Sequence, residues 1–280
     1  MLNSGAWRSA LSRQTLLVLP ALILMVGVFI YPVGRLLLRS LSEPVWGLQN
    51  FRELMAQPVY FSALVNTVVI SGSVTLICLL AGYPLAFTIA RASGRTQRLL
   101  IFAVLIPFWS SILVRTFAWL VLLQSRGLVN RTLIDLGIIE TPITMVHNRV
   151  GVLVGMVHIL LPFMVLPLYS VMVRIDASYT HAAASLGAPP VKNFLRIYLP
   201  LSWPGVINGT VLVFVMGLGY FITPALLGGA GDTMIAQLIE VEVADLGRWG
   251  VAGALAVVLM FGVTVTFAFL FRIGNPATRK

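Results

Sequence analysis

The chain has 280 residues, of which 59% are hydrophobic and only 10% are charged, and its formal net charge is +10. A soluble domain carries about 25% charged residues. This composition, with a mean hydropathy of +0.96, therefore excludes an ordinary soluble protein and indicates a membrane protein. The single cysteine, Cys78, excludes a disulfide bond within the chain.

Long apolar runs predict the membrane-spanning elements. Each run can cross a hydrocarbon core about 30 Å thick as a helix that rises about 1.5 Å per residue. Lipid cannot bond the open backbone groups of other structures, so we predict an all-α membrane protein with about six transmembrane helices. No clear cleavage site follows the first run, which we therefore expect to remain as a span. The runs cover residues 15–38, 62–90, 99–124, 150–173, 205–228 and 249–271.

The distribution of basic residues predicts the orientation of these spans. Loops rich in Lys and Arg stay on the cytoplasmic side of the membrane. With a cytoplasmic N-terminus, the cytoplasmic segments hold most of the basic residues and only one acid, Asp176, whereas acids outnumber basic residues outside. We therefore predict that both termini are cytoplasmic. The positive charge then follows from topology, and no nucleic acid partner is needed to explain it.

The only long cytoplasmic loop, residues 174–204, has the pattern of two short helices joined by a turn. Small residues at 182–185 give the first helix a surface that a partner can approach closely. Gly187 can end this helix in the left-handed conformation, and Pro189 or Pro190 can open the second helix. The loop is either an apolar projection for a cytoplasmic partner or a surface loop that packs only on its own spans. Helical spacing would place on one side of the second helix Val191, Phe194, Leu195 and Tyr198.

This loop resembles the coupling loop of binding-protein-dependent ABC import permeases. The family pattern is Glu-Ala-Ala, three residues, Gly, nine residues and then Ile-x-Leu-Pro. Here His181 stands in place of the family's Glu, and Ser185 stands where relatives often have Asp, so the shape is kept without those two charges. The residues that match at the family spacing are Ala182, Ala183, Gly187, Ile197, Leu199 and Pro200.

Further segments extend the resemblance over most of the chain and narrow it to the B-type permeases of spermidine/putrescine importers. These segments are residues 107–119, 161–169, 200–205 and 221–229. The resemblance implies a type I ABC importer permease in the bacterial cytoplasmic (inner) membrane, and a polyamine or a related amine or amino-acid derivative as solute. The organisation that it implies is a cytoplasmic segment 1–14, a single transmembrane permease domain 15–272 and a cytoplasmic tail 273–280.

The resemblance also implies the partners and the source of energy. The expected partners are a second homologous permease subunit, two ATP-binding subunits, an external solute-binding protein and the lipid bilayer. The chain has no Gly-x-x-x-x-Gly-Lys-Ser/Thr motif, so ATP and Mg²⁺ are expected in the partner subunits. We expect no catalytic residue, metal site or cofactor in this chain. The residues expected to couple the loop to an ATPase subunit are His181, Ala182, Ala183, Ser185, Gly187, Phe194, Ile197, Leu199 and Pro200.

The spans offer several candidates for a solute pathway. A charge at the depth of Arg115 costs about 2.5–3.5 kcal/mol in a membrane, so this residue either binds a carboxylate in the pathway or is a structural arginine. The flat face of Trp109 suits a cation or an alkyl chain, although tryptophan also anchors helices at the bilayer interface. Two glycines and a proline loosen the helix at residues 217–224, as at a cavity or a close helix contact. The candidates are Trp109, Arg115, Tyr220, Phe221 and Thr223.

Acidic residues of the outer loop 229–248 are candidates for attracting a cation or docking the binding protein, or they form a solvated face. They are Asp232, Glu240, Glu242 and Asp245. The alternative function is an ATP-independent secondary carrier, which would show ionisable groups at mid-membrane and internal symmetry. Only Arg115 and His158 are such groups, and we expect His158 to be a hydrogen-bonded packing residue.

Overall fold

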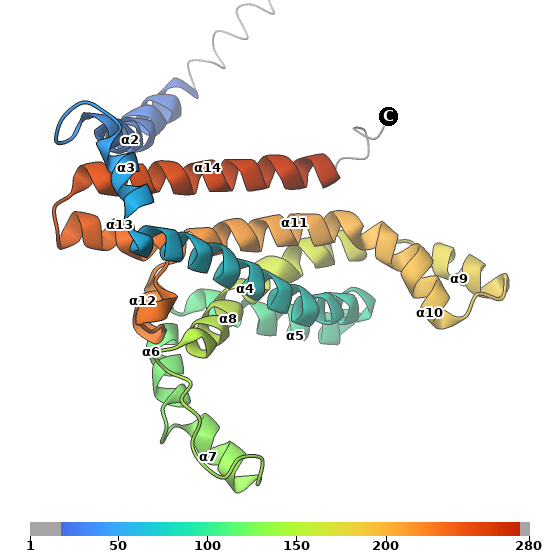
Figure 1. The fold of residues 1–280 in the computed structure, drawn as a ribbon. Helices are drawn as coiled ribbons and strands as arrows, with labels where there is room; N and C mark the ends of the chain where they lie inside the picture. Colours follow the sequence, from blue (N-terminus) through green and yellow to red (C-terminus); the bar gives the residue numbers. More distant parts are fainter. Residues whose placement is uncertain (1–17, 275–280) are drawn as a thin grey trace, which may run out of the picture. The chain divides into compact units, whose positions relative to one another are not determined.

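The computed structural model describes residues 18–274, and every regular element in that range is helical (Figure 1). Six helical stretches of the described chain are long and apolar enough to span a membrane, which confirms the predicted class and number of spans. They are Val18–Ser42, Pro58–Arg91, Ile112–Asp135, Arg149–Met172, Pro190–Leu218 and Trp249–Ala268. The predicted N-terminal segment 1–14 and most of the predicted tail 273–280 lie outside the described residues.

The chain divides into two compact units, and the first comprises Met1–Ala56 and Ile239–Val257. Its helices pack so closely that a Cβ added to Gly253 would collide with the backbone of Leu36. The buried side chain of Asn50 donates hydrogen bonds of 2.8 Å to the carbonyl oxygens of Ser40 and Glu43. The elements with residues in this unit are η1 (Met25–Ile30), α2 (Tyr31–Ser42), α3 (Gln49–Ala56), α13 (Ile235–Ala244) and α14 (Trp249–Gly274).

The second unit comprises Gln57–Leu238 and Val258–Lys280, and its core is formed by α4, α8 and α11, which lie side by side (Figure 1). Close approach depends on small residues, as at Gly209, where an added Cβ would lie 2.7 Å from the sulfur of Met164. Such contacts hold membrane helices together where lipid supplies no hydrophobic drive. Its elements are α4 (Pro58–Arg91), α5 (Gly94–Leu105), η2 (Ile106–Trp109), α6 (Ile112–Leu123), α7 (Leu128–Asp135), α8 (Arg149–Met172), α9 (Ala177–Ser185), α10 (Pro190–Asn193), η3 (Phe194–Tyr198), α11 (Leu199–Leu218), α12 (Ile222–Leu227) and η4 (Ala230–Asp232).

The prediction of one continuous third span over residues 99–124 is wrong. The α-helix α5 ends before a 3₁₀ turn that contains Pro107, and the chain is non-helical at Ser110 before α6 begins. Proline lacks the backbone N–H that would continue the helix and its ring clashes with the preceding turn. The membrane-spanning candidate of this region is Ile112–Asp135.

The predicted fifth span, residues 205–228, is displaced toward the N-terminus in the structure. One continuous helical stretch runs from α10 through η3 and α11 and ends at Leu218, and a break precedes α12. The π-helical turn η3 lies just before Pro200, where such an adjustment accommodates a missing N–H. The second helix of the cytoplasmic loop is therefore the beginning of a span rather than a separate element.

Candidate functional site

The loop 174–204 has the predicted helix–turn–helix form. The side chain of Asp176 caps α9 by accepting a 2.8 Å hydrogen bond from the backbone N–H of Ser178, which holds the pKa of the carboxyl below its usual range. Gly187 follows the end of α9 with φ +80°, and Pro190 is the first residue of α10. The side-chain amide of Asn193 donates to the Thr180 carbonyl oxygen at 2.8 Å and ties the two helices together. Figure 1 shows α9 and α10 at the end of α11 opposite to α12.

The tip of this loop is exposed and apolar. Leu186 is 88% exposed and Val191 is 70% exposed, on either side of the turn at Gly187. Ala183 is buried, and its helix α9 packs on α10 and η3 of the same loop. The remaining α9 candidates, which the structure leaves exposed, are His181, Ala182 and Ser185.

The second helix of the loop does not present one continuous apolar face. Val191 and Leu195 are exposed, whereas Phe194 is half-buried and Tyr198 is buried. Phe194, Leu195 and Tyr198 lie in the π-helical turn η3, where the angle between successive side chains differs from that of an α-helix. Phe194 is therefore placed against this chain's own helices. Of the last three candidates in the loop, Pro200 is exposed, and Ile197 and Leu199 are half-buried.

The buried side of this helix forms an inner aromatic cluster with α4 that the sequence reading missed. Phe87 contacts the ring of Phe194 edge-on at 5.9 Å and that of Tyr198 at 5.0 Å. The Tyr83 hydroxyl lies 2.8 Å from Oγ of Ser202. The sequence signal that could have predicted this cluster is the spacing of its members by four residues along each helix. The cluster consists of Tyr83, Phe87, Arg91, Phe194, Tyr198 and Ser202.

A second group of predicted residues meets near the break after α11. The Nε of Arg115 on α6 is buried without a hydrogen-bond partner among the described residues, and so is the hydroxyl of Tyr220, although the Thr223 side chain lies near it. Arg115 acts electrostatically on both Tyr220 and His158. The Nε1 of Trp119 donates to Nδ1 of His158 at 3.1 Å, so this histidine has the expected hydrogen-bonded packing role.

Of the other pathway candidates, Thr223 lies in this group, whereas Trp109 and Phe221 are exposed. Thr223 is fully buried, with its hydroxyl 3.3 Å from that of Thr116, and a Cβ on Gly155 would collide with it. The close approach of α8 and α12 encloses the Thr223 side chain, and its predicted place in the solute pathway stays a prediction. Trp109 is 72% exposed on η2, and Phe221 is also exposed.

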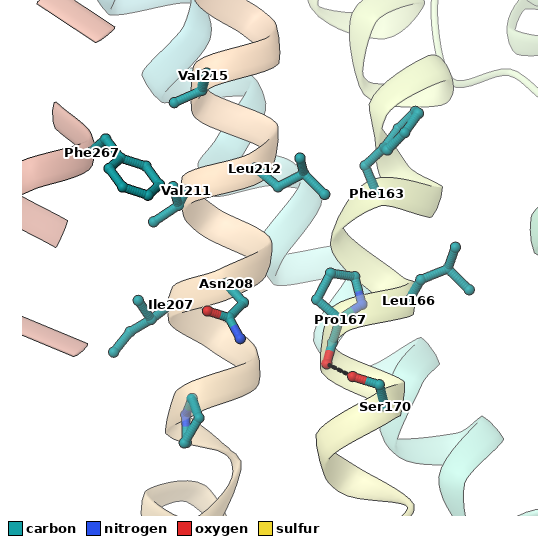
Figure 2. A pocket seen from close by; sticks show the side chains of 11 residues that line it. Phe163, Leu166, Pro167, Ser170, Ile207, Asn208, Val211, Leu212, Val215 and Phe267 are labelled. Atoms are coloured by element: carbon teal, nitrogen blue, oxygen red, sulfur yellow. Dashed lines mark hydrogen bonds between the residues drawn. The ribbon is translucent and has the colours of Figure 1, made fainter. Parts of the chain in front are cut away.

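A groove of about 830 Å³ lies between α8 and α11 (Figure 2). Its polar side chains are Asn208 on α11 and Ser170 on α8, and Ser170 donates a 2.8 Å hydrogen bond to the Pro167 carbonyl oxygen. An exposed amide such as that of Asn208 is costly against lipid and favours a protein or water neighbour. The remaining lining residues are apolar: Phe163, Leu166, Pro167, Pro204, Ile207, Val211, Leu212, Val215 and Phe267.

The outer acids differ in their surroundings. Asp232 is only 9% exposed and accepts a 3.1 Å hydrogen bond from Arg149, and Glu242 is only 4% exposed and pairs with Arg248 at 2.7 Å. A buried carboxylate needs such a partner, and the predicted docking role of these two acids stays a prediction. The two that remain exposed are Glu240 and Asp245. Among the described residues, no group of three His, Cys, Asp or Glu side chains could hold a metal ion.

Comparison with known proteins gives consistent matches. The sequence model of the family described as "Binding-protein-dependent transport system inner membrane component" matches residues 79–280. The spermidine/putrescine transport system permease protein PotB of Haemophilus influenzae is 37% identical over 232 residues, which are 83% of this chain and 79% of that protein. PotB of Escherichia coli is 35% identical over 241 residues, which are 86% of this chain and 87% of that protein. The fold is similar to a chain in the crystal structure of a bacterial alginate ABC transporter in complex with an alginate pentasaccharide-bound periplasmic protein, with TM-score 0.79, 20% identity, and coverage of 97% of this chain and 98% of that one.

Proposed function

The chain belongs to the family of inner membrane components of binding-protein-dependent transport systems, and we propose that its importer carries a polyamine or a related amine or amino-acid derivative. The chain is a multi-pass permease subunit of a bacterial ABC importer, and such subunits are not catalytic. Membership in this family sets aside the ATP-independent carrier. The family match, residues 79–280, includes parts of both compact units, and the single permease domain 15–272 remains part of this proposal.

The observation that carries the solute assignment is the likeness to PotB. Identity of 35–37% extends over most of the chain, and the relatives' names state spermidine and putrescine. The exposed acids Glu240 and Asp245 suit an approaching cation, and the indole of Trp109 offers a face that can bind an ammonium group. We assign Arg115 to a structural role at the helix break, because a fixed positive charge repels a polyamine.

The energy is supplied by partner subunits in this proposal. Two ATP-binding subunits hold ATP and Mg²⁺, and one of them binds the exposed tip of the loop 174–204 on the cytoplasmic side. Leu186 and Val191 provide the apolar part of this contact. His181 and Ser185 stand where relatives have acidic residues, so the contact contains no carboxylate from these two positions. Closure of the two ATPase subunits then moves the loop and switches the spans between inward-open and outward-open packings, a two-state rigid-body change. A second permease completes the pathway, and an external binding protein delivers the solute.

The test is transport by the complete complex in proteoliposomes that contain ATP. We expect uptake of radiolabelled spermidine or putrescine that requires the binding protein and stops with vanadate. Alginate fragments and amino acids serve as competitors that should not reduce this uptake. Uptake of another solute class, with no competition by polyamines, would overturn the solute assignment. Polyamine uptake that persists without ATP would overturn the role of the partner ATPases.

A further inference from the structure

The inner aromatic cluster consists of two matched rows of side chains. Tyr83, Phe87 and Arg91 follow one another at intervals of four residues along the cytoplasmic end of α4. Residues four apart lie on one face of a helix, so these three side chains form a single row. A second row at the same spacing begins in η3 and continues into α11, with members Phe194, Tyr198 and Ser202.

Each side chain of the first row contacts at least one side chain of the second row. Tyr83 contacts the ring of Phe194 edge-on at 6.0 Å, and Phe87 contacts the rings of both Phe194 and Tyr198 edge-on. At one end, the guanidinium carbon of Arg91 lies 4.1 Å from the ring centre of Phe87 and 5.4 Å from that of Tyr198. Edge-on ring pairs and cations over rings are attractive beyond the area they bury. Sliding or rotation of one helix against the other would break several of these contacts together.

The other end of the cluster is closed by a hydrogen bond. The Ser202 hydroxyl donates to the Leu199 carbonyl oxygen at 2.9 Å, which uses its only hydrogen. The Tyr83 hydroxyl lies 2.8 Å from Ser202 Oγ, and the two hydroxyls share a hydrogen bond between the helices. Ser202 is fully buried, so water does not compete for this bond.

The row on the loop side belongs to the continuous helical stretch Pro190–Leu218. A displacement of the loop is therefore carried along the helix to Phe194 and Tyr198 without a hinge segment. These two residues lie in the π-helical turn η3, and such turns are rare and frequent at functional sites. The cluster thus holds α4 at the place where the loop helix has its irregular turn.

We propose that the inner aromatic cluster transmits the movement of the coupling loop to α4, with Phe87 and Arg91 as positioning residues for ATP-driven transport. This inference rests on the proposed function, because it takes an ATPase as the source of the movement. The cluster makes α4 follow the loop helix as one body. Without it, α4 is held to the loop helix only by the packing of α4, α8 and α11 in the core, and its movement with the loop is reduced.

The experiment measures movement of α4 at its far end. Val59, at the beginning of α4, is exposed and is replaced by cysteine in a Cys78→Ala background, in the complete complex with its ATPase. The rate of maleimide labelling is compared between the nucleotide-free complex and the vanadate-trapped complex. We expect trapping to change the labelling rate about fivefold or more. In Arg91→Gln and in Phe87→Leu, trapping should proceed with a clearly smaller change in the labelling rate.

Two further variants separate a positioning role from a loss of folding. Arg95→Gln removes an exposed arginine of α5 and should keep the full labelling change. Arg91→Lys keeps a cation over the rings and should restore much of the response. Membrane levels, co-purification with the ATPase and basal ATP hydrolysis should be equal in all variants.

Two results would overturn the inference. One is a full labelling change in Arg91→Gln and Phe87→Leu, and the other is no labelling change in the parent complex when trapping is complete. The readout needs no transported solute, so an incorrect solute assignment would appear only in the uptake assay. A complex that contains no ATPase would contradict the proposed function itself.

Discussion

Arg149, the first residue of α8, donates its Nε hydrogen to Oδ1 of Asp232 at 3.1 Å, although 83 residues separate them in the chain. The Nη2 of the same guanidinium donates to Oδ1 of Asn66 on α4 at 2.8 Å. The amide of Asn66 in turn donates to the Gly231 carbonyl oxygen at 2.7 Å. One arginine thus ties together two spans and the turn η4.

Replacing this arginine should destabilise the second unit. Arg149→Gln leaves the carboxylate of Asp232 with only 11% of its side chain exposed and without its charged partner. Solvent reaches Arg149, which is 44% exposed, and this limits the expected loss of unfolding free energy to about 1–3 kcal/mol. The loss should be seen as a lower midpoint of thermal unfolding in detergent. The double variant Arg149→Gln/Asp232→Asn should recover part of it. Arg131→Gln removes an exposed charge as a control, and equal midpoints for the two single variants would contradict the structural role.

Substitution of Gly187 should uncouple transport. The residue has φ +80°, with no atom near the position of an added Cβ, so Gly187→Val strains the backbone by about 1–2 kcal/mol and alters the shape of the tip. We expect normal membrane levels and a large loss of ATP-driven uptake. Gly94, with φ +59° and equal free space, lies outside the loop, and Gly94→Val is the matched control. If both variants transport normally, the proposed contact at the tip is wrong.

The cap of α9 should fail only in acid. The hydrogen bond from Ser178 keeps the pKa of Asp176 below its usual range, so the charged cap stabilises the helix above the ordinary Asp pKa of about 3.9. That contribution is lost as the pH falls through the depressed pKa of the folded loop. The protection of the amides of residues 177–185 against hydrogen exchange should therefore not depend on pH above pH ~5. It should decrease well below that pH. Asp176→Asn should remove this acid dependence. Loss of protection near neutral pH would point to another group.

The groove residue Asn208 should affect transport without supporting the fold. Asn208 is exposed in a mostly apolar groove, so Asn208→Leu should leave the unfolding midpoint unchanged or slightly raised in detergent. If the groove faces water or solute, the same change should lower uptake by about tenfold, which is a difference of about 1.4 kcal/mol. The neighbouring change Ile207→Leu conserves volume and should be silent. Equal uptake by both variants would assign the groove to lipid.

The sequence by itself determined the class, the number of spans and the form of the cytoplasmic loop. These properties depend on local chemistry: apolar length sets a span, and glycine and proline set helix ends. Gly187 and Pro190 act through their own backbone limits, so their places in the turn could be predicted without the fold. The same reasoning located the loosened helix at residues 217–224. It did not anticipate that Pro107 breaks the third run, because a proline inside an apolar segment can also be accommodated within a helix, as at Pro84 in α4.

Only the tertiary structure decided which polar and aromatic side chains meet. From the sequence, Asp232 and Glu242 are candidates for docking or for a solvated face, and the structure buries each of them against an arginine. Thr223 read as a pathway residue, but the approach of Gly155 encloses it. Phe87 and Tyr198 come together because α4 and α11 pack along their length, and π-helical η3 directs Tyr198 inward. A contact between residues more than one hundred positions apart depends on helix packing and rotation, which a local pattern does not specify.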